Sequence, residues 1–134
     1  MFQVFDLHNE AAGRVGLNSA AITTNTNTDG AIIDTAGFES LEYYIQSATI
    51  TDGTYVVQLF HGNDSGLSDA AQVTGEEILG AATFVSTDDN AVKRVGYVGK
   101  KRYVRIRVVS TGVTTGGTLG AVAVLGTAHH APVA

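Results

Sequence analysis

Positive charge in this sequence is concentrated in one short segment. Seven of its eight Lys and Arg residues lie between Lys93 and Arg107, whereas all thirteen Asp and Glu residues lie between Asp6 and Asp89. Guanidinium and ammonium groups bind carboxylates through charge-assisted hydrogen bonds, so this segment suits an acidic partner. The whole chain has a net charge of −5, which disfavours wholesale nucleic-acid binding, and we expect no specific nucleic-acid partner. The predicted chemistry is recognition of an acidic protein surface, which another copy of the chain could supply.

The basic residues also follow the period of a strand. From Tyr103 to Val108, an aromatic or basic residue alternates with Val or Ile. This pattern predicts a strand with an apolar face inward and a basic face outward. We therefore predict an interface composed of Lys100, Lys101, Arg102, Tyr103, Arg105 and Arg107.

A solvated face that discourages edge aggregation is the alternative interpretation of the same strand. The interface is favoured because clustered cations repel one another unless acids meet them, and the segment from Lys93 to Arg107 contains no acid. Arg also suits desolvated ion pairs at interfaces. The acidic segment from Asp64 to Glu77 is the predicted counterpart, either within the chain or on a neighbouring copy.

Other candidate chemistry in the sequence is weaker. The segment from Asn25 to Gly30 resembles the start of a calcium loop, but Ala36 occupies the position where that loop needs Glu. Gly96 and Gly99-Lys100 lack the spacing and the Ser or Thr of a phosphate-binding loop. The four His residues are too scattered to indicate a metal site, and no nucleophile motif is present. We expect a protein that is not an enzyme and that has no catalytic residues, cofactor or metal.

Composition indicates an all-β protein. The 134 residues include sixteen Gly and one Pro, and Thr, Val and Ile are plentiful, with Gly, Asn and Asp between them. The length suits one domain that folds without disulfides, since Cys is absent. We expect neither a signal peptide nor a membrane-spanning segment. The prediction is a single-domain, jelly-roll-like β-sandwich of about eight strands over residues 1–134, with a C-terminal arm at 126–134.

Apolar and polar alternation places the elements. Leu41, Tyr43 and Ile45 mark a half-buried strand, and a strand from Thr54 to His61 is apolar on both faces, which indicates burial on both sides. Helix is expected only as a short turn near Gly75 to Leu79. Strands are expected at residues 2–7, 20–24, 31–34, 41–46, 54–61, 81–86, 91–98, 101–109 and 119–125, with a turn at 25–30 and a long loop at 62–75.

Several strings in the sequence resemble small structural proteins of tailed bacteriophages. The most specific is Gly-Tyr-Val-Gly-Lys-Lys-Arg-Tyr-Val-Arg at residues 96–105. The others are Asp52–Tyr55, Asp69–Val73, Ile78–Gly80 and His130–Val133. The resemblance covers roughly residues 39–134 and is to proteins encoded beside the major capsid protein, in particular head decoration, or cement, proteins.

This resemblance implies a jelly-roll-like protein on the outside of a phage head, assembled in the bacterial host cytoplasm. It implies that the partner is the major capsid protein and that the chain self-associates as a homo-oligomer, either a dimer or a trimer. A carbohydrate-binding β-sandwich, or another virion component such as a tail or adhesion protein, is the alternative. The absence of Trp weakens the carbohydrate interpretation, although five Tyr residues remain available: Tyr43, Tyr44, Tyr55, Tyr97 and Tyr103.

Overall fold

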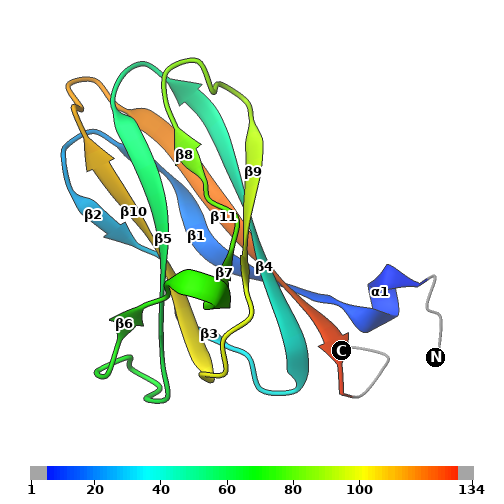
Figure 1. Ribbon diagram of the computed structural model, residues 1–134. Helices are drawn as coiled ribbons and strands as arrows, with labels where there is room; N and C mark the ends of the chain where they lie inside the picture. Colours follow the sequence, from blue (N-terminus) through cyan, green and yellow to red (C-terminus); the bar gives the residue numbers. More distant parts are fainter. Residues whose placement is uncertain (1–5, 130–134) are drawn as a thin grey trace.

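Two antiparallel β-sheets pack face to face in the computed structural model, which describes residues 6–129 (Figure 1). Sheet A has the strand order β1-β11-β4-β9-β7. Its strands are β1 (Ala12–Ile22), β4 (Phe38–Ile50), β7 (Ile78–Leu79), β9 (Val92–Tyr97) and β11 (Gly117–Ala128).

Sheet B has the strand order β2-β10-β5-β6, and two further short strands pair with its central members, β3 with β10 and β8 with β5. Its strands are β2 (Asn27–Asp29), β3 (Ile33–Asp34), β5 (Thr54–Gly62), β6 (Ala71–Gln72), β8 (Thr83–Phe84) and β10 (Tyr103–Thr111). The helical elements among the described residues are one turn, α1 (Leu7–Glu10), and a 3-10 turn, η1 (Gly75–Glu77).

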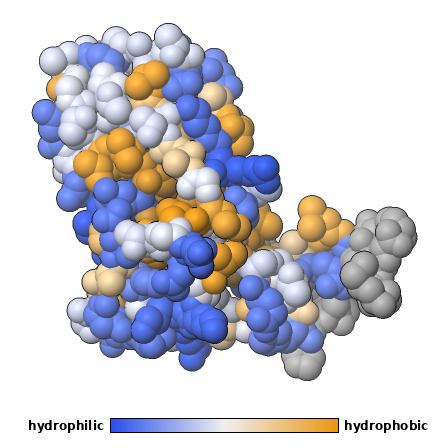
Figure 2. Space-filling view, in the orientation of Figure 1, coloured by the Kyte–Doolittle hydropathy of each residue, from blue (hydrophilic) through white to orange (hydrophobic). Residues whose placement is uncertain are grey.

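The hydrophobic core lies between the sheets and is built by alternation along each long strand. On β10 every second side chain, from Val104 through Ile106 to Val108, is fully buried. β4 contributes Tyr43 and Ile45 from the opposite sheet in the same way. Apolar side chains form a band across the middle of the visible face, and hydrophilic side chains cover the strand ends (Figure 2). Burial of one face per strand is what holds the two sheets together.

One polar junction connects the β4–β5 turn to the β10–β11 loop. The carboxylate of Asp52 accepts backbone N–H hydrogen bonds from Thr114, Thr115 and Gly116, the last at 2.9 Å. A hydrogen bond from the Thr114 hydroxyl, together with these backbone hydrogen bonds, holds the pKa of Asp52 well below its ordinary value. Gly53 follows with a φ of 92°, a left-handed conformation that glycine adopts without steric cost. The junction fixes one end of the sandwich.

The all-β sandwich predicted from the sequence is confirmed. The short helical turn expected near Gly75 to Leu79 is present as η1 at Gly75–Glu77, whereas Ile78–Leu79 form strand β7. Residues 6–129 contain eleven strands rather than about eight, because three short strands that were not expected, β2, β6 and β7, are present; β3 and β8 lie within the expected strands at 31–34 and 81–86. The expected strand at 20–24 is the end of the much longer β1. The expected turn at 25–30 contains β2, which pairs with β10.

The two ends of the chain differ from expectation where the structure describes them. Residues 2–7 were expected as a strand, but Leu7 begins α1, whose first turn is capped by the Asp6 carboxylate accepting the N–H of Asn9. Residues 1–5 lie outside the described part. The arm predicted at 126–134 starts later, because β11 continues to Ala128 and the His129 N–H bonds to the carbonyl of Gly37. Residues 130–134 also lie outside the described part.

Strand β5 is buried on one face only, which corrects the expectation of two buried faces. Tyr55, Val57 and Leu59 point into the core, whereas Val56 is 37% exposed on the outer face. Phe60 shares that outer face and is half-buried because the guanidinium of Arg107 lies over its ring, 4.3 Å from the centroid. A charged side chain, rather than a second apolar layer, therefore covers this aromatic ring.

A candidate interaction surface on strand β10

The predicted basic face exists on the outer side of sheet B. Tyr103, Arg105 and Arg107 are half-buried and alternate with fully buried neighbours along β10. On one side, Arg105 lies opposite Phe60 of β5. On the other side, Arg107 lies opposite Asp29 of β2. The three β10 side chains, which we call the basic row, are therefore positioned by strands on both sides.

One carboxylate serves two guanidinium groups of the basic row. Arg107 donates two hydrogen bonds to Asp29, from Nε at 2.6 Å and from Nη2 at 3.2 Å. Arg105 approaches the same carboxylate only to 3.7 Å, and its buried Nε has no hydrogen-bond partner among residues 6–129. The hydrogen bond from Arg107 is the main reason that the pKa of Asp29 is lowered. Two cations share one anion, so this trio carries an excess positive charge.

Arg102 forms a separate bidentate pair at the start of the row. Its Nε and Nη2 atoms each lie 2.8 Å from an oxygen of Asp34. This hydrogen bonding lowers the pKa of the Asp34 carboxyl. The Arg102 backbone is also held, because its carbonyl accepts hydrogen bonds from the N–H and the hydroxyl of Thr35. The pair is about half exposed, so it orients Arg102 more than it stabilises the fold.

Among residues 6–129, no ion pair joins the predicted acidic counterpart, the segment from Asp64 to Glu77, to the basic row, and its role as the counterpart on a neighbouring copy stays a prediction. Its Asp64 and Asp69 carboxylates accept backbone N–H groups of their own loop, including those of Gly66 and Asn63. The acids that meet the row are instead Asp29 and Asp34, more than sixty residues earlier in the sequence than their Arg partners. Short strands β2 and β3 carry them to the free side of β10.

The two predicted Lys residues lie in the loop before β10 rather than on the strand. Lys101 was expected to extend the row, but β10 begins only at Tyr103. Both Lys100 and Lys101 are exposed and form no ion pair among the described residues. With Arg102 they line one wall of a groove of about 480 Å³, whose lining also includes Tyr97 and His129. Three of the six predicted residues, Lys100, Lys101 and Arg102, thus lie at the groove before β10, and the other three follow on the strand.

Sequence reasoning missed two residues of this surface. Phe60 supports Arg107, and its position opposite Arg105 follows from β5–β10 pairing that no local pattern reveals. His129 lies at the groove and pairs with Glu39 across the β11–β4 end. The sequence did indicate that Phe60 points outward, because Phe60 and the polar Gln58 are two residues apart and so share one face of the strand. Its pairing with Arg105 had no such signal.

Within residues 6–129, no group of three or more His, Cys, Asp or Glu side chains is arranged to hold a metal ion. The same residues contain no helix that is long and apolar enough to cross a membrane. The contacts that the structure shows on this surface are ion pairs and cation–π contacts.

These features define a β-sandwich of two antiparallel sheets with a basic row on the outer face of one sheet. Neither a family model nor a curated protein matches the sequence. Two solved structures share the fold at low sequence identity. They are the PBSX exported protein XepA (TM-score 0.58, 14% identity, 97% of this chain and 41% of that chain) and the SPBc2 prophage-derived protein YomS (TM-score 0.51, 13% identity, 86% of this chain and 93% of that chain). The present chain therefore spans less than half of the XepA chain.

Proposed function

We propose that this chain is a structural virion protein of a tailed bacteriophage that binds the outside of the capsid and stabilises the head. The observation that carries the proposal is the sandwich fold common to this chain and two phage-derived proteins, XepA and YomS. The resemblance of residues 96–105 to head decoration proteins supports the same class. In this proposal the partner is the major capsid protein, the chain acts as a homo-oligomer, and no catalysis is involved.

The basic row supports a docking role because its charge is only partly neutralised. Asp29 compensates one of the two guanidinium groups beside it, and Arg105 is left without a hydrogen bond among residues 6–129. An acidic group on a partner would complete the pairing. Lys100 and Lys101 extend the positive strip at the end of the sheet. The proposed partner surface is therefore acidic and faces the outer side of sheet B.

A decoration protein stabilises a shell by mass action. A ligand that binds only the assembled lattice lowers its free energy, and many copies of a modest interface act together. A chain with a partly paired basic row on one sheet face suits this role, because each copy needs only a few ion pairs. The acidic character of the whole chain keeps copies soluble before attachment.

The test compares phage particles assembled with and without this protein. We expect particles that lack it to open at lower temperature or at lower chelator concentration, and added protein to restore resistance. Immunogold labelling should place the protein on the head. Equal stability of the two kinds of particle, or labelling confined to tails, would contradict the proposal; tail labelling would favour the alternative of a tail or adhesion component.

A further inference from the structure

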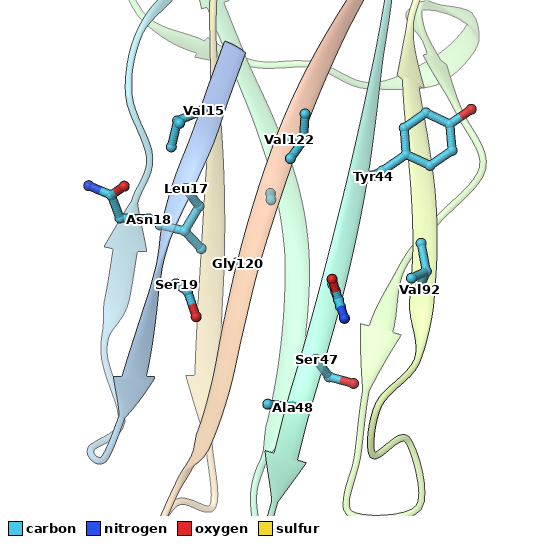
Figure 3. Close-up of a pocket in the computed structure, with 12 residues that line it drawn as sticks. Val15, Leu17, Asn18, Ser19, Tyr44, Ser47, Ala48, Val92, Gly120 and Val122 are labelled. Carbon is cyan, nitrogen blue, oxygen red and sulfur yellow. The ribbon is translucent and has the colours of Figure 1, made fainter. Parts of the chain in front are cut away.

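The outer face of sheet A carries a row of exposed apolar side chains. Val15 of β1 lies opposite Val122 of β11, which in turn lies opposite Tyr44 of β4. Their exposed fractions are 56%, 49% and 40%. Figure 3 looks onto this face and shows the three side chains in line across adjacent strands. They form an apolar ridge that no other part of residues 6–129 covers.

A hollow of about 490 Å³ lies beside the ridge. Its floor is at Gly120, and small residues such as Ser19 and Ala48 line it (Figure 3). A Cβ at Gly120 would lie 3.1 Å from the Cα of Ser19, so glycine permits the close approach of β1 there. The exposed side chain of Val92 stands at the far wall. Ridge and hollow are therefore adjacent on one face.

Two opposite charges sit on the same face without pairing to each other. Arg94 of β9 lies opposite Tyr44 of β4. Glu42 of β4 lies opposite Gly96 of β9, two residues further along the same two strands. Within residues 6–129, neither Glu42 nor Arg94 forms an ion pair. The face thus offers one unpaired acid and one unpaired base next to an apolar ridge.

We propose that the outer face of sheet A is a contact between two copies of this chain, related by a two-fold axis. A two-fold contact places the same surface on both sides, so residue i of one copy meets residue j of the other and the reverse. The ridge of each copy then enters the hollow of the other. Glu42 of each copy meets Arg94 of the second copy, which gives two ion pairs for each contact.

Charge identifies a second copy as the occupant. The chain has a net charge of −5, yet this face carries one acid and one base, so two copies meet here without local repulsion. A strongly acidic partner, of the kind that suits the basic row, would bring like charge against Glu42. A strongly basic partner would bring like charge against Arg94. Only a partner surface that carries both an acid and a base can form ion pairs with both Glu42 and Arg94.

The contact is small. Four strands at about 4.8 Å spacing and three cross-strand rows give a patch on the order of 400 Å² in projection. A standard interface buries about 800 Å² on each partner, so we expect a dissociation constant in the micromolar range. The proposed function includes a homo-oligomer, and this inference rests on it, because it names the surface through which the copies associate.

The first experiment measures self-association of the full chain by sedimentation velocity from about 1 to 500 µM, where a micromolar dimer dissociates. Val122→Lys buries a charge in the ridge and should weaken the dimer roughly tenfold or more. Val98→Lys is the matched control, because Val98 is 52% exposed and lies outside this face, and it should dimerise like the unaltered chain. Circular dichroism checks that both variants keep the β fold. A monomer at every concentration, or equal dimerisation of both variants, would overturn the proposal.

The second experiment exchanges the charges. Glu42→Arg alone and Arg94→Glu alone should each dimerise poorly, because each puts like charges together at both pairs. A mixture of these two single variants should form a heterodimer, since every contact then joins Arg to Glu. Failure of the mixture to associate would contradict the two-fold arrangement even if the unaltered chain dimerises.

Attachment to phage heads is read separately, which distinguishes the two proposals. Loss of dimerisation in Val122→Lys with weak residual attachment supports the contact between copies. If the unaltered chain is monomeric and Val122→Lys fails to attach, the face contacts the capsid instead and the inference is wrong while the proposed function stands. Absence of any attachment by a chain that dimerises as described contradicts the proposed function alone.

Discussion

The Nδ1 atom of His61 lies 2.8 Å from the hydroxyl oxygen of Tyr97, and this contact joins the two sheets. His61 belongs to β5 of sheet B and Tyr97 to β9 of sheet A, and their rings meet edge to face. The same hydroxyl accepts the backbone N–H of Lys101 at 3.0 Å. One buried oxygen therefore ties both sheets to the loop that leads into the basic row.

Tyr97→Phe should destabilise the fold by about 1–3 kcal/mol, because His61 and the Lys101 N–H lose a hydrogen-bond partner in a buried setting. Urea unfolding measures the change. Tyr44→Phe is the matched control, since Tyr44 is 40% exposed on the outer face of sheet A, and its effect should be within about 0.5 kcal/mol. Equal effects of the two substitutions would show that the inter-sheet contact contributes nothing.

Replacing Arg105 and Arg107 together with Ala should weaken capsid attachment while leaving the β spectrum intact. Their ion pairs with Asp29 are partly exposed, so each contributes at most about 1 kcal/mol to folding. A desolvated pair with the capsid would be worth roughly 2–5 kcal/mol. Arg14→Ala removes the one basic residue outside the segment and is the control. Unchanged attachment of the double variant across a salt titration would identify the row as a solvated face.

Acid should weaken the junction at Asp52. The hydrogen bonds from Thr114, Thr115 and Gly116 lower the folded-state pKa of Asp52 below its ordinary value of 3.8. The stabilisation is therefore complete above the unfolded pKa and is lost as the pH falls through the lower folded pKa. We expect Asp52→Asn to flatten the fall in unfolding free energy between about pH 4 and pH 2. Parallel pH curves for the two proteins would contradict this.

Phe84→Ala should cost about 3–5 kcal/mol, although β8 is only two residues long. The ring is fully buried in the core, and the Nζ atom of Lys93 lies 5.0 Å from its centroid. Phe84→Leu keeps most of the volume and should cost clearly less. Denaturant unfolding measures both. A cost for Phe84→Ala below about 1 kcal/mol would mean that this short strand does not hold the core.

The sequence predicted the elements whose patterns are local. Strand β10 follows a strict period of two, so its buried and outward residues could be assigned before the structure. The 3-10 turn at Gly75 was equally local. Strand β1 was mostly missed because its Ala, Gly and Asn residues carry a weak strand signal.

Pairings between distant segments could not be read from the sequence. Asp29 and Asp34 meet Arg107 and Arg102 because β2 and β3 pair with β10, and no spacing rule connects residues so far apart. The segment from Asp64 to Glu77 was predicted as the acidic counterpart instead. The apolar ridge on sheet A could not be predicted either, because Val15, Val122 and Tyr44 become neighbours only through strand register.

The position of β11 also determines when this protein can fold. β11 comes last among the strands of residues 6–129, yet it lies between β1 and β4, with Leu125 opposite both Ala12 and Leu41. During synthesis, β1 and β4 are made long before the strand that separates them. Both have edges exposed to other chains until residues 117–128 emerge. Sheet A therefore closes only after residues 117–128 have left the ribosome, and a nascent chain stalled before β11 should be prone to aggregation and to protease cleavage.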